Sequence, residues 1–180
     1  ANRFLTAGLG LASVADAVIV SDANGGLYRV ATTNLADPSI AVQTRLPATG
    51  NSLAASDSAL YVAAGTMGLL TVDPATLAVV ATNATGGEAS DVALSSSTLY
   101  VATGFGGCQA WDVSSPLAPV LLGTFGIGVR AVDADLSANT LFVAADEAGF
   151  QVHSLGNLAS PEWIATIASS TNPRCLAVSD

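Results

Sequence analysis

The sequence contains few charged residues. They make up 11% of the 180 residues, against the roughly 25% that is usual for a globular domain. Lysine is absent, and the basic residues are Arg3, Arg29, Arg45, Arg130 and Arg174. A net charge of −9 with so few basic side chains argues against nucleic acid, whose binding depends on clustered cations, and against anionic lipid. We therefore expect neither as a partner.

Long apolar runs, histidines and cysteines are also scarce. No apolar run approaches the ~18 residues of a membrane-spanning helix, so no membrane span is expected. His153 is the only histidine, which excludes a multi-histidine metal site, and no Gly-x-Ser-x-Gly motif accompanies it. The two cysteines, Cys108 and Cys175, lack metal-ligand spacing, and either two free thiols or an extracellular disulfide would fit them. No catalytic site is evident, and we predict that the chain is not an enzyme.

What the sequence does contain is a repeat. Four short apolar runs end in valines that are 42, 39 and 42 residues apart: Val20, Val62, Val101 and Val143. After each run a glycine opens a stretch of alternating residues, and these glycines keep the same spacing: Gly26, Gly68, Gly107 and Gly149. Because the valines and the glycines share the same spacing, the sequence indicates four tandem copies of one unit of roughly 40 residues.

Each unit contains four short segments rich in Val, Leu, Tyr and Thr, separated by turns of Gly, Asp, Asn, Ser and Pro. This pattern predicts four antiparallel strands. The first segment holds small residues, as expected where blades converge on a central channel, and larger residues such as Tyr61, Tyr100 and Trp111 would fill the space between blades. We therefore predict an all-β fold, a β-propeller of four-stranded antiparallel blades. This chain would hold about four blades, either as a whole ring or as part of a larger one.

The repeat also predicts where each blade begins. Residues 1–180 form a single repeat domain, with blades over 11–52, 53–91, 92–131 and 132–175. Residues 3–10 are expected to be the fourth strand of a preceding blade, and residues 176–180 the first strand of a further blade. Three arrangements remain open. The chain is a segment of a longer propeller, or a second copy or another chain completes a ring or filament, or four blades close alone.

The third unit carries a family resemblance. Leu99–Gly104 followed by Gly106–Pro116 resembles the LVIVD-repeat family, in which a Tyr-Val-Ala run leads through a Gly-rich turn to a strand ending in Asp-Val/Ile-Ser-x-Pro. The match extends over all four units, but residues 31–33 and 153–155 lack the acidic turn. The resemblance implies an extracytoplasmic bacterial or archaeal propeller, often one module of a larger surface protein. It implies no enzymatic activity, and its motif residues are structural.

One segment of the fourth unit suggests a metal. Oxygen-bearing side chains occupy alternate positions there: Asp133, Asp135, Ser137 and Asn139. They resemble the beginning of a calcium-binding loop. The sixth position is Ala138 where such loops have glycine, and the twelfth is Ala144 where they have glutamate. A polar hairpin turn explains the pattern as well, and calcium is the only cofactor that we consider.

A second group of acidic residues falls at turns after the second predicted strand. Asp22, Asp146 and Glu147 occupy equivalent turns, so we expect them on one face of the disc. Such a rim would suit a cation or a cationic ligand. Solvated turns are the simpler interpretation.

Two functions fit these observations. The first is a non-enzymatic extracellular structural or interaction protein, a propeller building block in a surface layer, a filament or a larger surface protein. Its partners would be copies of itself or the remainder of a longer chain. The alternative is a ligand-binding module that uses loops on one disc face for a sugar, a peptide or a cation. The shortage of charge favours the first, because surfaces covered by other subunits need few charges.

Overall fold

The computed structural model describes residues 8–34, 38–126 and 128–178, and these residues form an all-β protein. They build four sheets of four antiparallel strands, and neighbours in sequence are neighbours in each sheet. This is the blade architecture of a β-propeller, which confirms the predicted fold class. Within the described ranges, no helix has the length and hydrophobicity that crossing a membrane requires.

The strands follow the same order in every blade. Blade 1 comprises β1 (Gly8–Val14), β2 (Ala17–Asp22), β3 (Gly26–Ala31) and β4 (Ser39–Arg45). Blade 2 comprises β5 (Ser52–Ala55), β6 (Leu60–Ala63), β7 (Leu69–Val72) and β8 (Val79–Asn83). Blade 3 comprises β9 (Asp91–Ser95), β10 (Thr98–Ala102), β11 (Cys108–Asp112) and β12 (Val120–Phe125). Blade 4 comprises β13 (Asp133–Ser137), β14 (Thr140–Ala144), the 3-10 turn η1 (Asp146–Ala148), β15 (Phe150–Ser154) and β16 (Glu162–Ile167).

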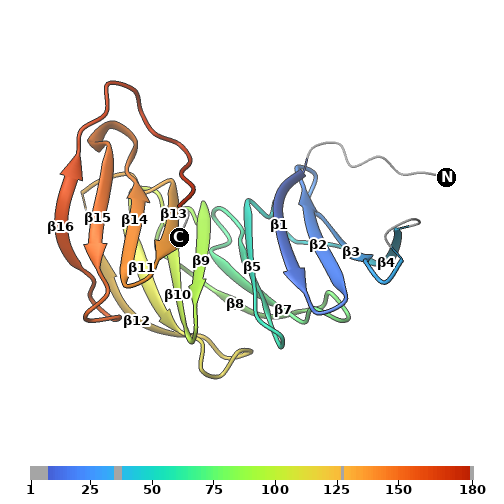
Figure 1. The fold of residues 1–180 in the computed structure, drawn as a ribbon. Helices are drawn as coiled ribbons and strands as arrows, with labels where there is room; N and C mark the ends of the chain where they lie inside the picture. The colour runs from blue at the N-terminus through green and yellow to red at the C-terminus, as the bar shows by residue number, and fades with distance from the viewer. Residues whose placement is uncertain (1–7, 35–37, 127, 179–180) are drawn as a thin grey trace.

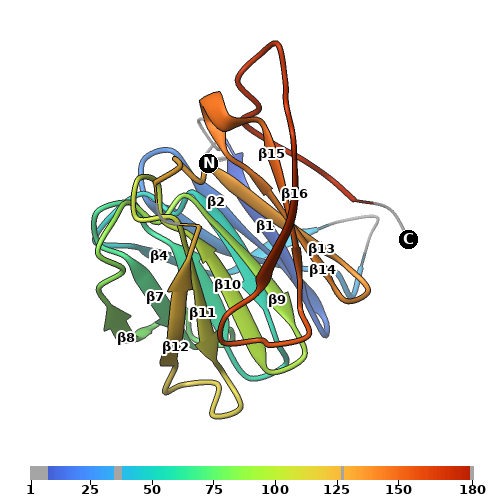
Figure 2. The ribbon, with the colours of Figure 1, turned by 90° about the vertical axis from the view of Figure 1, so that its left-hand side faces the viewer.

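The blades are arranged as an arc. The first strand of each blade lies beside the first strand of the next, so β1, β5, β9 and β13 cross the middle of the molecule in this order (Figure 1). The fourth strands lie at the outside of the arc. In Figure 2, blade 4 lies in front, in orange and red, and blade 1 lies behind it, in blue.

Successive residues of the middle strands face opposite neighbours, because side chains alternate between the two faces of a strand. In β6, Leu60 and Val62 pack against blade 1, whereas Tyr61 and Ala63 pack against blade 3. Since both faces of this blade are covered, every residue of β6 is buried. Its sequence is therefore a continuous apolar run instead of an alternating one.

Three apolar cores hold the four blades together. The core between blades 1 and 2 contains Leu70, the core between blades 2 and 3 contains Leu99, and the core between blades 3 and 4 contains Leu141. Among the described residues, no such core joins blade 4 to blade 1, and these blades lie at opposite ends of the arc (Figure 1). A ring closed by these four blades alone is therefore not the arrangement observed.

The prediction that residues 3–10 form the fourth strand of a preceding blade is wrong for residues 8–10. These residues begin β1, which pairs with β2, and the amide of Gly10 donates to Oγ of Ser21 at 3.0 Å. The register shifts between Gly8 and Gly10, and such a bulge lets a glycine-rich segment continue the strand. Residues 3–7 lie outside the part of the chain that the structure describes.

The C-terminal segment, predicted to begin a further blade at 176–180, is described as far as Val178. The amide of Leu176 donates to Oδ2 of Asp133, and the amide of Val178 donates to Oδ2 of Asp135 at 2.8 Å. Residues 176–178 are not assigned to a strand, but alternate amides bind alternate residues of β13. The segment therefore runs along β13, and residues 179–180 lie outside the described ranges.

Candidate functional site

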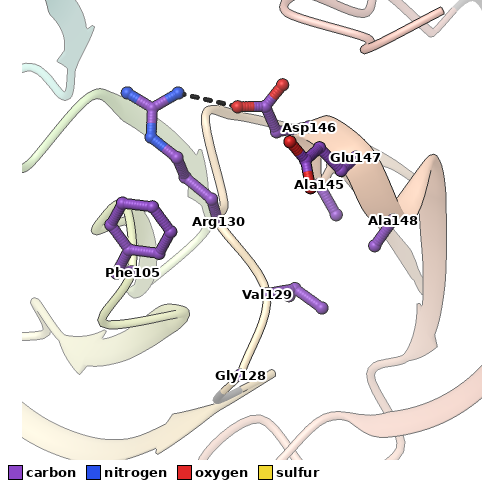
Figure 3. A pocket seen from close by; sticks show the side chains of 8 residues that line it. All are labelled: Phe105, Gly128, Val129, Arg130, Ala145, Asp146, Glu147 and Ala148. Atoms are coloured by element: carbon purple, nitrogen blue, oxygen red, sulfur yellow. Dashed lines mark hydrogen bonds and ion pairs between the residues drawn. The ribbon is translucent and has the colours of Figure 1, made fainter.

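A cavity of about 360 Å³ lies where loops of blades 3 and 4 meet (Figure 3). Because the strands of each blade are antiparallel, the turn from second to third strand lies at the same end as the connection to the next blade. At this junction the turn after β10, the segment before β13 and the turn after β14 come together. They contribute Phe105, Arg130 and the pair Asp146 and Glu147, and residues 128–129 complete one wall.

An ion pair crosses the cavity. Nη1 of Arg130 donates to Oδ2 of Asp146 at 3.0 Å, and the guanidinium carbon lies 5.7 Å from the centre of the Phe105 ring (Figure 3). Asp146 is 9% exposed, whereas Phe105 is 81% exposed. Arg130 is therefore held between a buried carboxylate and an aromatic ring that is open to solvent.

Asp146 occupies a backbone conformation that favours glycine. Its φ is +45°, and the residues at the same position of blades 2 and 3 are Gly65, with φ +56°, and Gly104, with φ +59°. These glycines exchange two backbone hydrogen bonds each, with Ala89 and Ala131 respectively. Aspartate tolerates the left-handed region better than most residues, but at a cost in free energy that glycine avoids. The blade fold alone therefore does not require an aspartate here.

The preceding junction shows that the ion pair is particular to this site. Arg130 follows Glu88 by 42 residues, and Asp146 follows Gly104 by the same interval. A Cβ atom built on Gly104 would lie 3.8 Å from Cβ of Glu88, so the two positions are close at that junction too. Glu88 and Gly104 cannot form an ion pair. The repeat therefore supplies the proximity, and the sequence of blade 4 supplies the charges.

Two carboxylate groups at the cavity retain bonding capacity. Glu147 is exposed and makes no hydrogen bond or ion pair with the described residues (Figure 3). Oδ1 of Asp146 is buried and has no hydrogen-bond partner among those residues, although Oδ2 binds Arg130. The cavity therefore carries two carboxylates and one guanidinium.

The predicted rim is only partly realised. The structure brings Asp146 and Glu147 together in the cavity, but Asp22 is not part of it. Oδ1 of Asp22 accepts hydrogen bonds from the amides of Asn24, at 2.9 Å, and Gly26, at 2.8 Å, and Oδ2 accepts from the Tyr28 hydroxyl at 3.0 Å. Asp22 therefore stabilises its own turn and does not contribute to this cavity.

The residues of the predicted calcium loop do not form such a loop. Residues 133–137 form strand β13, in which side chains on one face are about 7 Å apart along the strand. Asp133, Asp135, Ser137 and Asn139 are therefore spread along the blade and do not converge on one ion. In the part of the chain that is described, no group of three or more His, Cys, Asp or Glu side chains could hold a metal ion.

Asp133 and Asp135 instead belong to a row of carboxylates on the inner strands. Ala134 donates its amide proton to Oδ2 of Asp91 at 2.9 Å, and Leu176 does the same to Asp133, which follows Asp91 by 42 residues. Burial raises the pKa of Asp91 to about 7, and the neighbouring Asp133 carboxyl adds to the increase. Asp91 thus ties β9 to β13, and Asp133 ties β13 to the C-terminal segment. The repeat spacing of the two aspartates was the available sequence signal for this role.

The remaining reactive side chains are dispersed. Cys108 is buried and Cys175 is exposed, and both are free thiols, so the disulfide alternative is not realised. Burial raises the pKa of the Cys108 thiol to about 12, with a further contribution from Asp91. His153 is buried and packs edge-on against Phe125, with the two ring centres 5.4 Å apart. Burial lowers the pKa of the His153 imidazole. Cys108 and His153 therefore lie in or against the core between blades 3 and 4, whereas Cys175 lies at the surface.

Comparison with known proteins defines the class of this protein as a β-propeller. A functionally unknown protein from Desulfotomaculum acetoxidans superposes with a TM-score of 0.81 at 13% identity, over 98% of this chain and 61% of the other. The Swd1 β-propeller domain from Myceliophteria thermophila superposes with a TM-score of 0.74 at 9% sequence identity, over 90% of this chain and 60% of the Swd1 chain. BamB from Moraxella catarrhalis superposes with a TM-score of 0.66 at 14% sequence identity, over 92% of this chain and 52% of the BamB chain.

These comparisons concern the fold. The identities are low, and the chain spans only 52% to 61% of the length of these three structures. No protein-family model and no curated protein matches the sequence. Propellers commonly mediate protein–protein interactions, and function must be argued from the surfaces of this chain.

Proposed function

We propose that this chain is a non-enzymatic propeller building block of the cell exterior, which assembles with further blades of the same repeat through the two open faces of its arc. The proposal rests on the exposure of apolar residues at the two end blades. At the same repeat positions, the inner blades bury these residues.

The open face of blade 4 carries large apolar side chains. Phe142 follows Tyr100 by 42 residues, and Ile167 follows Phe125 by the same interval. Tyr100 is 0% exposed and Phe125 is 8% exposed, because blade 4 covers them. Ile167 is 58% exposed, and Phe142 is only partly buried. The face that blade 3 uses to bind blade 4 is thus repeated on blade 4 without a cover.

The open face of blade 1 is the counterpart. Leu11 is 66% exposed, whereas Leu53 and Val92, at the same position of blades 2 and 3, are 7% and 6% exposed. Val18 and Val20 are partly exposed, at positions where blades 2 to 4 bury leucine and valine. Burial therefore alternates along β2, with the partly exposed residues on the side away from blade 2.

These two faces are the two halves of an interface that the chain already makes three times. At each internal junction, one face of a blade packs its apolar side chains against the leucines and valines of the blade that follows it in sequence. Burying such faces is favourable by roughly 25 cal/mol for each Å² of apolar surface removed from water. A blade of the same repeat is therefore the partner whose shape and polarity fit each open face.

The C-terminal segment supports a blade as the occupant. The bond from the amide of Leu176 to Asp133 repeats the bond from the amide of Ala134 to Asp91, at the same interval of 43 residues. Residues 176–178 thus take the place of the next inner strand along β13. A further blade at this face would continue an arrangement that this segment begins.

The proposed location rests on two observations from the sequence. The third unit resembles the LVIVD-repeat family, which implies an extracytoplasmic propeller. Charged residues make up only 11% of the chain, which suits a surface largely covered by neighbouring blades. Location would be tested separately, by fractionation of the producing cell and detection of the chain with an antibody.

The native mass of the purified 180-residue chain tests the assembly. We expect a species larger than the 17.8 kDa monomer at neutral pH, and we expect reductant to leave it intact because apolar faces hold it together. A mass that falls to that of the monomer on reduction would instead assign the association to the exposed thiol of Cys175. A monomer at all concentrations up to about 100 µM would contradict assembly between copies at the affinity typical of stable interfaces.

A further inference from the structure

We propose that the cavity between blades 3 and 4 binds a ligand that carries an ammonium or guanidinium group. The open faces lie on blades 1 and 4 away from this junction, so the inference does not depend on the proposed assembly. It assigns the predicted affinity for cationic ligands to particular residues.

The charges of the cavity select a cation. Asp146 and Glu147 contribute two carboxylates, and Arg130 offsets one of them. Glu147 has no partner in the described structure, and the whole chain carries a net charge of −9. An incoming anion would meet the repulsion of both carboxylates, whereas an incoming cation would pair with Glu147.

Phe105 offers a second element of cation recognition. Its ring is 81% exposed and lies at the cavity opposite η1, which carries Glu147 (Figure 3). Arg130 already lies against the ring, at 5.7 Å from its centre. A cation with an attached alkyl chain would contact the exposed ring edge and face while its charge pairs with Glu147. The ligand class is therefore an alkyl ammonium or alkyl guanidinium.

The departure from the repeat indicates that these side chains serve more than the fold. Asp146 adopts φ +45° at a position where blades 2 and 3 use glycine. A strained side chain that neighbouring copies do without is typical of functional positions. Arg130 departs from the repeat at the partner position, where the preceding junction has Glu88. Together, Asp146 and Arg130 form the ion pair that places a buried carboxylate at the cavity.

The volume limits the size of the bound group. About 360 Å³ lies at the lower end of the range for small-molecule sites, roughly 300–1,000 Å³. It admits a small amine or the side chain of one lysine or arginine, but not a folded partner. The ammonium or guanidinium group therefore comes either from a free small molecule or from a side chain that a protein inserts.

Titration with simple probes tests the site. n-Butylamine and arginine amide would be added to the isotopically labelled chain, and backbone amide shifts of residues 104–106 and 145–149 would be followed by NMR. We expect saturable shifts with both cations, and none with n-butanol, which matches n-butylamine in size but lacks the charge. Binding of n-butanol as tight as that of n-butylamine, or no saturable shift with either cation, would overturn the proposal.

Variants assign the binding to the named carboxylates. We expect Glu147→Gln to weaken cation binding about threefold, as for an exposed ion pair. We expect Asp146→Gly to weaken it about tenfold, because Arg130 would lose the carboxylate that offsets its charge and would repel the cation. Asp146→Gly introduces the residue that blades 2 and 3 carry, so the fold is expected to persist. Glu88→Gln, at the preceding junction, is the matched control and should leave the affinity unchanged. Equal weakening by all three variants would overturn the assignment, since it would reflect only the overall charge.

A peptide comparison distinguishes the two sources of the cation. A short peptide with one central lysine would be titrated beside the same peptide with norleucine. Binding at least tenfold tighter than that of n-butylamine, lost with norleucine, would identify an inserted protein side chain. Binding of the lysine peptide no tighter than that of n-butylamine would identify a free small amine. Tight binding of the norleucine peptide would contradict the proposal, because charge would not be what is recognised.

Discussion

The backbone amide of Ala134, in β13, donates a hydrogen bond of 2.9 Å to Oδ2 of Asp91, in the neighbouring strand β9. This bond joins two blades at their inner strands, and its acceptor is a largely buried carboxyl beside Asp133. Burial raises the pKa of Asp91 to about 7, and Asp133 adds to the increase. We therefore expect the stability of the junction between blades 3 and 4 to depend on pH.

The first prediction concerns this sensitivity. The pKa of Asp91 is about 7 in the folded chain, against about 3.9 for an unfolded aspartate. Between these values the folded state binds more protons than the unfolded state, so the free energy of unfolding falls as pH rises from about 4 to about 7. Above that range the loss is complete, and we expect it to amount to roughly 2 to 4 kcal/mol. Urea unfolding at a series of pH values measures it.

The variant Asp91→Asn should abolish most of this dependence. An asparagine keeps an oxygen to accept from Ala134 but carries no charge to desolvate. We expect the variant to be more stable than wild type at pH 8 and to lose that advantage at pH 4. Asp57→Asn, in an exposed turn, is the control. An unfolding free energy of wild type that stays constant from pH 4 to pH 7 would contradict the role of Asp91.

The second prediction compares one substitution at two equivalent positions. The Tyr61 hydroxyl donates to the carbonyl of Pro116 at 3.0 Å, whereas the Tyr100 hydroxyl is buried and has no partner among the described residues. Removing a bonded hydroxyl costs about 1 kcal/mol, whereas removing an unbonded buried one costs nothing or stabilises. We expect Tyr61→Phe to lower the melting temperature and Tyr100→Phe to maintain or raise it. Calorimetry measures both, and a larger loss for Tyr100→Phe would refute the assignment.

The third prediction exchanges residues between two junctions. Gly104→Asp places a side chain at φ +59° beside Glu88, so backbone strain and like charges should destabilise the fold by about 1–3 kcal/mol. Asp146→Gly relieves strain but removes the bond to Arg130, and we expect a change of less than about 1 kcal/mol. Denaturant unfolding of both variants tests the asymmetry. Equal losses would mean that the two junctions are not distinct.

Much of the fold could be predicted from spacing alone. Apolar runs 42, 39 and 42 residues apart correctly placed β2, β6, β10 and β14, because each of these middle strands buries at least one apolar face against a neighbouring blade. Of the two interpretations of residues 133–139, the hairpin turn is confirmed at 138–139. The calcium loop is not formed, because Asp133 and Asp135 lie along β13 and accept from backbone amides of residues 176 and 178, about 43 residues away in sequence. A short stretch of sequence cannot predict a hydrogen-bond partner that lies so far away in the chain.

The candidate site could be predicted only in part. Asp146 and Glu147 were recognisable because they are acidic residues at a turn. Arg130 and Phe105 were not, because they belong to other segments, and the fold brings them together only when blades 3 and 4 pack. The absence of glycine at 146, where blades 2 and 3 have Gly65 and Gly104, was a further sequence signal that pointed to this position.

The last prediction concerns the open face of blade 4. Ile167 is 58% exposed, and its equivalent Phe125 is covered by blade 4 at the preceding junction. Ile167→Asp would place a charge where a further blade is proposed to pack, and an unpaired charge at such an interface is costly. We expect this variant to shift the chain towards the monomer in sedimentation velocity, by at least tenfold in dissociation constant. Because Ile167 is exposed within the arc itself, the fold should survive.

Val120→Asp is the matched control for this experiment. Val120 is 60% exposed, so it resembles Ile167 in exposure and polarity, but it lies in β12 at the outer edge of an internal blade. If the end face makes the contact, Val120→Asp should leave the dissociation constant within about twofold of wild type, since surface substitutions away from an interface have small effects. If Val120→Asp dissociates the assembly and Ile167→Asp does not, the blades associate by their outer edges. The open faces of the arc would then need a different explanation.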